Sequence, residues 1–257
     1  MTAPKPQTIG ARLFSQLEVL FQSEEAPSEF QLRRLAAEAD QLMGADAGAG
    51  LIVKSGVAAL RWDVNEARKL ALRSVQVDPS IITLMNAALT LKNVSLMDEA
   101  CEFIERARQR APQDPDSVES SIVYLMHAGR IAQAADVHKQ ALNDKVKLPD
   151  DLIDAVGYLG LIEELGIDLE RVHFEVQSVY KVLMQHRKRP RTITYSHYQE
   201  PDGGRALVIS FGIRGDLTDE MRLESELAQE LAEQDGWNPN VLGVEFEIDT
   251  EHADNAA

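Results

Sequence analysis

The chain has 257 residues, 44% of them hydrophobic, which is enough apolar material for one large domain or two smaller ones and excludes disorder for most of its length. Its formal net charge is −16, and residues 192–257 hold fifteen Asp and Glu against three Arg. A surface this acidic repels nucleic-acid phosphates and favours basic partners, unless it serves solubility alone.

The sequence carries no signal for export or for membrane insertion. It has no run of about 18 apolar residues, and residues 1–10 lack a basic region followed by an apolar segment. Cys101 is the single cysteine, so no internal disulfide can form, and its place on an apolar helix stripe predicts a buried thiol. We therefore expect a soluble cytoplasmic protein that makes no contact with a membrane.

Two amphipathic helices are predicted before residue 48. The first covers residues 9–21 and the second covers residues 29–43. Apolar residues recur at intervals of three and four along one face of each helix: Leu13, Leu17 and Leu20 in the first, and Leu32, Leu35, Ala36 and Ala39 in the second. We expect residues 1–47 to cap the helical array that follows.

Similar segments recur every 33 or 34 residues between residues 48 and 148. Small residues mark the period at Ala67, Ala100 and Ala134 and again at Ser74, Ala107 and Ala141, while Pro79 and Pro112 repeat the first spacing. Each unit reads as two helices, and the proline ends the second helix because it cannot continue one. One such pair cannot bury its own apolar face, so the units are predicted to stack on one another.

These residues resemble the tetratricopeptide repeat (TPR) family, whose helix-turn-helix unit carries small residues at fixed positions and a proline near its end. The middle unit, residues 81–114, fits best, with Leu84, Ala88, Leu91, Ala100, Ile104, Ala107 and Pro112 in the expected classes. The units at residues 48–81 and 115–148 depart from the pattern, the third by Ile122 at a position that is usually small and by the displaced Pro149. The resemblance implies a mainly α fold, a right-handed helical-hairpin solenoid of three repeats; a generic solenoid of helical hairpins is the alternative.

In this family the first helices of successive units line a concave groove that receives peptides or helices. Carried over position by position, the resemblance gives a partner-binding groove made of Ile52, Ala59, Ile82, Met85, Leu89, Lys92, Glu119, Val123, Met126 and His127. This set is largely apolar. It lacks the cations of the subgroup that clamps a C-terminal carboxylate, since the matching positions hold Ile52 and Gly56 in the first unit and Asp116 and Ser120 in the third.

A further helical hairpin is predicted at residues 149–188. Its helices cover residues 149–164 and 168–186, with a turn at Gly166. Along the second helix a stripe of apolar residues recurs at intervals of three and four: Leu169, Val172, Val176, Val179 and Leu183. Such a stripe is either a packing face within the chain or the seam of a homodimer.

After residue 188 the period changes from helical to alternating. Strands are predicted at residues 192–199 and 205–213, joined by a Pro- and Gly-containing turn at 200–204, and they are followed by an acidic helix at 218–234 that ends at 235–236 and by a strand at 241–249. Residues 189–250 therefore form a small α+β module of β-β-α-β order, and residues 251–257 a disordered acidic tail. Because about 60 residues bury only a small core, we expect the module to lean on the helices or on a second copy.

No combination of residues in the sequence predicts catalysis, a cofactor or a metal site. The six histidines show neither His-x-x-x-His nor Cys-His spacing, and there is no phosphate-binding glycine loop and no nucleophile elbow. The Arg-Gly-Asp tripeptide at 214–216 is interpreted as a strand-to-helix turn. The basic run at 186–191 is short and has no aromatic residues between its charges, so it fits a charged hinge or a dock for the chain's own acidic helix better than a nucleic-acid site.

The leading hypothesis is a non-enzymatic adaptor or chaperone-like protein that binds an apolar peptide or an amphipathic helix in the groove. One structural possibility is that the N-terminal helices or the helix at 168–186 fill that groove. A second hypothesis is a homo-oligomer that assembles through the 169–183 stripe or through the edges of the C-terminal sheet. A third is an acidic inhibitor or regulator that uses Glu220, Glu224 and Glu230 to occupy a basic site on another protein.

Overall fold

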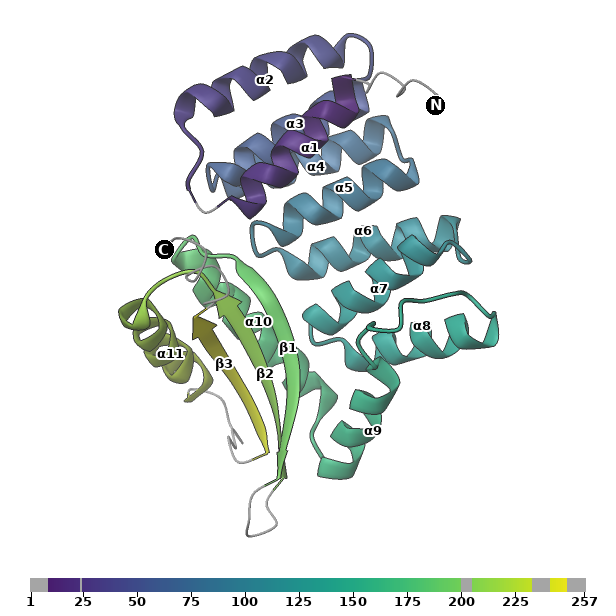
Figure 1. Cartoon of the computed structure of the whole chain (residues 1–257), viewed down its shortest axis with the longest axis vertical. Coiled ribbons are helices and arrows are strands. Elements are labelled where there is room, and N and C mark those ends of the chain that lie inside the picture. Colours follow the sequence, from purple (N-terminus) through teal and green to yellow (C-terminus); the bar gives the residue numbers. More distant parts are fainter. Residues whose placement is uncertain (1–8, 24, 200–204, 233–240, 249–257) are drawn as a thin grey trace, which may run out of the picture. The chain divides into compact units, whose positions relative to one another are not determined.

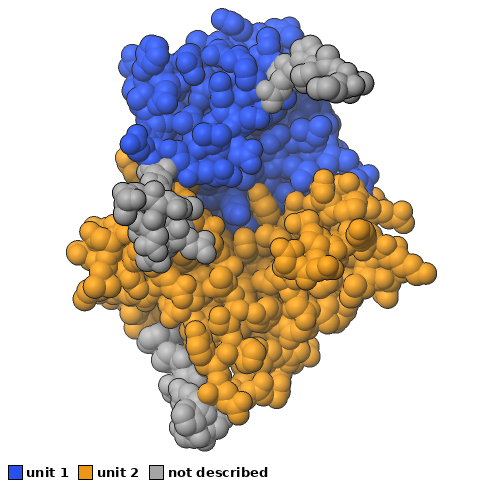
Figure 2. Space-filling view, viewed as in Figure 1, with its two compact units in different colours: residues 1–111 blue, residues 112–257 orange. Residues whose placement is uncertain are grey.

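The computed structural model describes residues 9–23, 25–199, 205–232 and 241–248, and the chain divides into two compact units. Unit 1 is residues 1–111 and unit 2 is residues 112–257 (Figure 2). The predicted turn at 200–204, the predicted helix end at 235–236 and the predicted tail at 251–257 lie outside the described residues.

Unit 1 is helical throughout its described part. Its elements are α1 (Ile9–Gln22), α2 (Glu29–Met43), α3 (Ala47–Leu60), α4 (Val64–Val77), α5 (Ile81–Lys92) and α6 (Met97–Arg110) (Figure 1). Side-chain caps set several of their starts: Ser28 and Gln31 form a reciprocal capping box at α2, and Asp46 and Asp63 cap α3 and α4. The two predicted N-terminal helices are confirmed.

The small residues of the 33- to 34-residue period are buried, as predicted. In unit 1, Ala67, Ala100 and Ser74 have no exposed surface and Ala107 has almost none. The Ser55 hydroxyl donates a 2.7 Å hydrogen bond to the carbonyl of Ala67, which joins α3 to α4 where both backbones come close. Small side chains at these positions let the helices of each hairpin approach one another.

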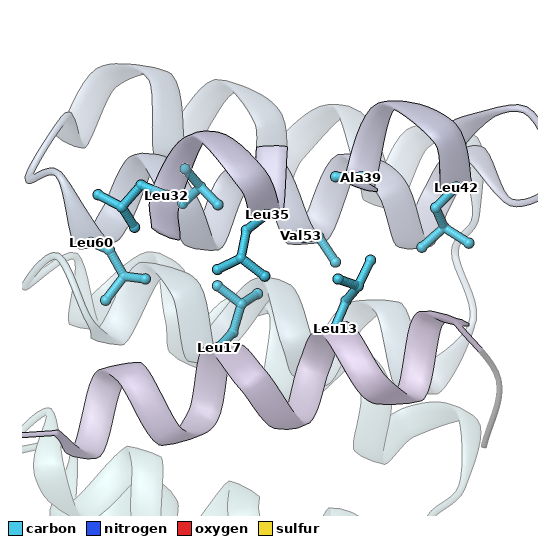
Figure 3. Close-up of a cluster of buried hydrophobic side chains, with 9 residues drawn as sticks. Leu13, Leu17, Leu32, Leu35, Ala39, Leu42, Val53 and Leu60 are labelled. Carbon is cyan, nitrogen blue, oxygen red and sulfur yellow. The ribbon is translucent and has the colours of Figure 1, made fainter. Parts of the chain in front are cut away.

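The first three helices share one hydrophobic core (Figure 3). Leu13 and Leu17 of α1 point at apolar side chains of α2 and α3, namely Leu32, Leu35, Ala39 and Leu42 from α2 and Val53, Val57 and Leu60 from α3. Nearly every residue of α3 is buried, as expected of a helix that is apolar all round. Each fully buried leucine contributes about 1.5–3 kcal/mol relative to leaving it in water.

Unit 2 combines helices with a small sheet. Its elements are α7 (Pro115–His127), α8 (Ile131–Asn143), α9 (Ala155–Leu165), α10 (Leu169–Gln185), β1 (Pro190–Gln199), β2 (Arg205–Ile213), α11 (Leu217–Ala232) and β3 (Leu242–Ile248). The helix predicted from residue 149 begins only at Ala155, because Pro149 accepts a turn hydrogen bond from Leu152 and Asp154 caps the Gly157 N–H. Gly166 ends α9 in the left-handed conformation, at the predicted turn.

The sheet has the predicted β-β-α-β order, with β2 between its two neighbours. β1 pairs with β2 in antiparallel register, and β2 pairs with β3 in parallel register through the α11 crossover. The alternate residues Leu207, Ile209, Phe211 and Ile213 of β2 are fully buried on one face. Tyr180 of α10 meets Phe211 edge to face, so α10 packs against this side of the sheet (Figure 1). The fold is therefore mainly helical with a small three-stranded sheet, as predicted at that level.

The approach of α2 to α3 gives a test of unit 1. A Cβ atom added to Gly50 would lie 2.9 Å from the backbone carbonyl oxygen of Ala39, which cannot rotate away. We expect Gly50→Ala to lower the free energy of unfolding by about 1–3 kcal/mol in urea titrations. The matched change Gly160→Ala, at an exposed α9 position with no atom within 4 Å of the new Cβ, should raise it by about 0.5–1 kcal/mol. A Gly50→Ala protein as stable as the parent would contradict this packing.

Candidate partner-binding surfaces

The α3 part of the predicted groove is closed by the chain itself. Ile52 is 3% exposed and Ala59 is fully buried, so neither offers surface to a partner. The helix α1 lies over α3: a methyl of Leu17 sits 2.8 Å from where a Gly56 Cβ would be, and Phe21 packs against the cluster that contains Ala59. The assignment of Ile52 and Ala59 to an open groove is therefore corrected, because an N-terminal helix covers this face.

The helix α5 presents an apolar face to solvent. Ile82 is 69% exposed and Leu89 is 41% exposed, while Met85 between them is partly exposed. The three residues follow one another at i, i+3 and i+7, so they lie on one side of the helix. Apolar side chains gathered on an exposed helix face are the usual mark of an interaction surface.

The borders of the α5 face are polar but carry no acid. Asn86 and Lys92 flank it, and α5 contains neither Asp nor Glu although the chain is strongly acidic. Lys92 is partly buried, and this burial lowers the pKa of its ammonium group. In unit 1 the structure thus brings Ile82, Met85, Leu89 and Lys92 together on one helix face.

The α7 part of the predicted groove lies in unit 2 and is partly used within the chain. Glu119, Val123 and His127 are half-buried and Met126 is fully buried. The carbonyls at the end of α7 are hydrogen-bonded by four side chains: Tyr195 of β1 at Met126, Tyr180 of α10 at His127, and Gln177 and His173 of α10 at Ala128. The C-terminal end of α7 is therefore held by α10 and β1. Of the four predicted groove residues on α7, Glu119, Val123 and His127 keep some exposed surface.

The predicted acidic face of α11 is divided between two roles. Glu230 forms an ion pair with Lys181 of α10 at 2.6 Å, so it links α11 to α10 within unit 2. Glu224 accepts a hydrogen bond from the backbone N–H of Phe246 in β3. Burial raises the pKa of the Glu224 carboxyl, and the nearby negative charges of Glu245 and Glu220 raise it further. Glu220 and Glu224 thus remain near one another, while Glu230 faces α10.

The basic run at 186–191 docks on the chain's own acidic helix, which was one of its two predicted roles. Lys188 pairs with Asp219 at 2.8 Å and also donates to the carbonyl of Arg214, and His186 lies 2.7 Å from Glu226. Arg214 and its neighbours form the turn between β2 and α11, so the interpretation of the tripeptide as a turn is confirmed.

The stripe predicted as a possible seam of a homodimer is largely buried inside unit 2, and each edge of the sheet has a hydrogen bond to a side chain. Of the 169–183 stripe, Val172, Val176, Val179 and Leu183 are fully buried. At the β1 edge the Tyr158 hydroxyl donates to the Tyr195 carbonyl. At the β3 edge, the Phe246 N–H donates a hydrogen bond to the Glu224 carboxylate. Capped edges of this kind discourage strand pairing between molecules.

Two residues of α11 were missed by sequence reasoning. Leu217 and Met221, one helical turn apart, are each 66% exposed. Leu223, Leu227 and Leu231 of the same helix are buried, whereas the sequence predicted only an acidic helix at residues 218–234, which begins after Leu217. The signal that could have found the exposed pair is its own i, i+4 spacing along a row that does not contain those leucines.

Comparison with protein-family models, with curated proteins and with solved structures finds no match for this chain. Across the described ranges, no helix is both long and apolar enough to span a membrane. Within the same residues, no group of three or more His, Cys, Asp and Glu side chains is placed to hold a metal ion.

Removing the hydrogen bond from Tyr195 to α7 should lower the stability of the protein. Tyr195→Phe leaves the buried Met126 carbonyl without its donor, so we expect the free energy of unfolding to fall by about 1–2 kcal/mol. Tyr198→Phe, three residues along β1 and 54% exposed, should change it by less than about 0.5 kcal/mol. Equal effects of the two changes in urea unfolding would show that the Tyr195 hydroxyl does not bind α7.

Because the pKa of Glu224 is raised, replacing this residue by Gln should stabilise the protein by an amount that depends on pH. Because folding disfavours the ionised carboxylate, its penalty is present above the raised pKa and disappears as the pH falls through it. Glu224→Gln removes the charge and keeps an oxygen for the Phe246 N–H, so Tm at pH 7 should rise by about 2 °C and the gain should shrink as the pH approaches 4. Thermal unfolding across pH 8 to 4 measures this. A gain that stays constant across that range would contradict the assigned cause.

Proposed function

We propose that this chain is a non-enzymatic adaptor, or chaperone-like protein, whose α5 face binds an apolar segment of another protein. The single observation that carries the proposal is the exposure of Ile82, Met85 and Leu89 on one side of a helix whose other residues are largely buried. A helix of a water-soluble protein normally turns its polar side outward, so this reversed arrangement favours a partner that covers it.

The bound segment is an amphipathic helix of two to three turns. From Ile82 to Leu89 the apolar face extends about 10 Å along the axis, which matches two turns of a partner helix. Leucine-like side chains spaced by three and four residues would lie against Ile82 and Leu89, and the flexible Met85 side chain between them adapts to partners of different shape. Asn86 and Lys92 supply the polar border.

The TPR-like repeat architecture is part of the same proposal. The 33- to 34-residue spacing, the burial of the small residues and the hydrogen bond from Ser55 to Ala67 support a solenoid of three repeats over residues 48–148. On this scheme residues 1–47 cap the array, residues 149–188 add a hairpin, and residues 189–250 form the α+β module. The cap then has a second role, because α1 closes the α3 face and leaves α5 as the open apolar surface of unit 1.

Substitutions on α5 test the proposal. The probe is a fluorescein-labelled peptide of about 18 residues that carries leucines at spacings of three and four and only Gln, Ser and Ala elsewhere, with binding followed by fluorescence anisotropy. Ile82→Glu combined with Leu89→Glu should weaken binding about tenfold or more, because two apolar anchors become charged. The far-ultraviolet circular dichroism should stay unchanged.

The matched control is Phe30→Glu combined with Val77→Glu. Both residues are exposed apolar positions of unit 1, on α2 and α4, and the double change adds the same charge. The control should bind the peptide as the parent does. Equal weakening by both double variants, or weakening by neither, would reject the assignment of binding to α5.

A further inference from the structure

The outer face of α11, in unit 2, is a second exposed apolar surface. Leu223, Leu227 and Leu231 hold the helix to its unit by the inner face and are buried. Leu217 and Met221 lie about a quarter turn around the helix from that inner face, and Ala228 and Ala232 continue their row as small exposed residues. The three buried leucines hold α11 in place, but Leu217 and Met221 stay exposed to water.

Carboxylates border this apolar pair on one side. Glu220 and Glu224 follow Leu217 and Met221 by three residues each, and Glu245 of β3 lies close enough to Glu224 to repel it. Within the described part of unit 2, the basic side chains that contact α11 meet other acidic residues than Glu220 and Glu224: Lys188, His186 and Lys181 contact Asp219, Glu226 and Glu230. Among the described residues, Glu220, Glu224 and Glu245 make no ion pair with Lys or Arg.

The charge of the whole chain lies in this half of the sequence. Residues 112–257 contain 28 Asp and Glu against 13 Lys and Arg, whereas residues 1–111 contain 14 against 13. The field around α11 is therefore negative at long range as well as locally. Such a field attracts cationic partners, and it repels nucleic acid, anionic membranes and a second copy of this chain.

We infer that the outer face of α11 binds a basic amphipathic helix of another protein, with Leu217 and Met221 at the centre of the contact and Glu220, Glu224 and Glu245 along one side. The partner's apolar stripe covers the leucine and the methionine. Its Lys or Arg residues reach the three carboxylates, which repel one another until a cation lies between them. The contacts of Asp219, Glu226 and Glu230 with Lys188, His186 and Lys181 stay in place, so binding needs no rearrangement of unit 2.

The probes are two labelled peptides with the same leucines at spacings of three and four, one with Lys and one with Gln at the polar positions. The full chain carrying Ile82→Glu and Leu89→Glu serves as the parent, so that binding at α5 does not interfere. We expect it to bind the Lys peptide at least tenfold more tightly than the Gln peptide at about 50 mM salt, and this preference should shrink at about 300 mM. Leu217→Ser with Met221→Ser should weaken binding of the Lys peptide about tenfold.

A charge variant tests the acidic border. Glu220→Gln with Glu224→Gln should weaken the Lys peptide several-fold and flatten its salt dependence, while binding of the Gln peptide stays unchanged. Glu163→Gln with Glu170→Gln removes the same charge from exposed positions of α9 and α10 and is the control. Leu142→Ser with Tyr198→Ser is the apolar control, since both residues are also more than half exposed in unit 2.

Three results would overturn the inference. Equal loss in the acidic variant and its control would mean that the peptide responds to net charge and not to this face. Equal loss in the apolar variant and its control would remove Leu217 and Met221 from the contact. A dimer of the parent that Leu217→Ser with Met221→Ser converts to a monomer would show that a second copy covers the face. None of these outcomes depends on whether α5 binds the neutral peptide.

Discussion

The close approach of paired helices is the constraint on which the helical part of this molecule depends. It is visible where the Ser55 hydroxyl reaches the Ala67 carbonyl and where Gly50 leaves no room for a Cβ beside Ala39. Both contacts require small side chains, because a larger one would separate the backbones and open gaps in a core that gains its stability from dense packing. The spacing of small residues along the chain therefore carries more structural information than the identity of the large apolar residues between them.

A second theme is that charge in this protein is arranged, and is not only abundant. Unit 2 uses part of its acidic excess internally, with Glu226 and Glu230 facing the basic end of α10. Exposed pairs of this kind are each worth less than about 1 kcal/mol, so the buried leucines of α11 set its position and the ion pairs select its orientation. Glu220 and Glu224, which pair with no Lys or Arg among the described residues, are the carboxylates that the proposed contact on α11 uses.

The elements were predictable from the sequence where the signal was periodic. The alternation from Leu207 to Ile213 indicated a strand with one buried face, and the recurrence of Ala67 and Ala100 indicated helices that pack closely; both are found. The helix α9 begins at Ala155 and not at residue 149. The Pro149 carbonyl accepts a turn hydrogen bond from Leu152, and the Asp154 side chain caps the helix at the Gly157 N–H. The exact start of a helix depends on a few local hydrogen bonds, and the spacing of apolar residues does not reveal them.

The surfaces were less predictable, because their exposure depends on distant segments. Ile52 and Ala59 are at positions that resemble groove residues, yet α1 covers α3. The sequence around residue 56 gives no sign that Leu17, about forty positions earlier, packs against it. The 169–183 stripe had two open interpretations, and only the packing of α10 against Phe211 separates them. Leu217 and Met221 went unnoticed since two apolar residues in an acidic helix form a weak pattern.

The crossover between β2 and β3 has a consequence for how the chain folds as it is synthesised. β1 and β2 are adjacent in sequence and can pair as soon as both have left the ribosome, whereas the other side of β2 waits for residues 242–248. During that interval β2 exposes one row of unpaired backbone groups. The nascent protein is then open to pairing with other chains at that edge until residues 242–248 pair with β2.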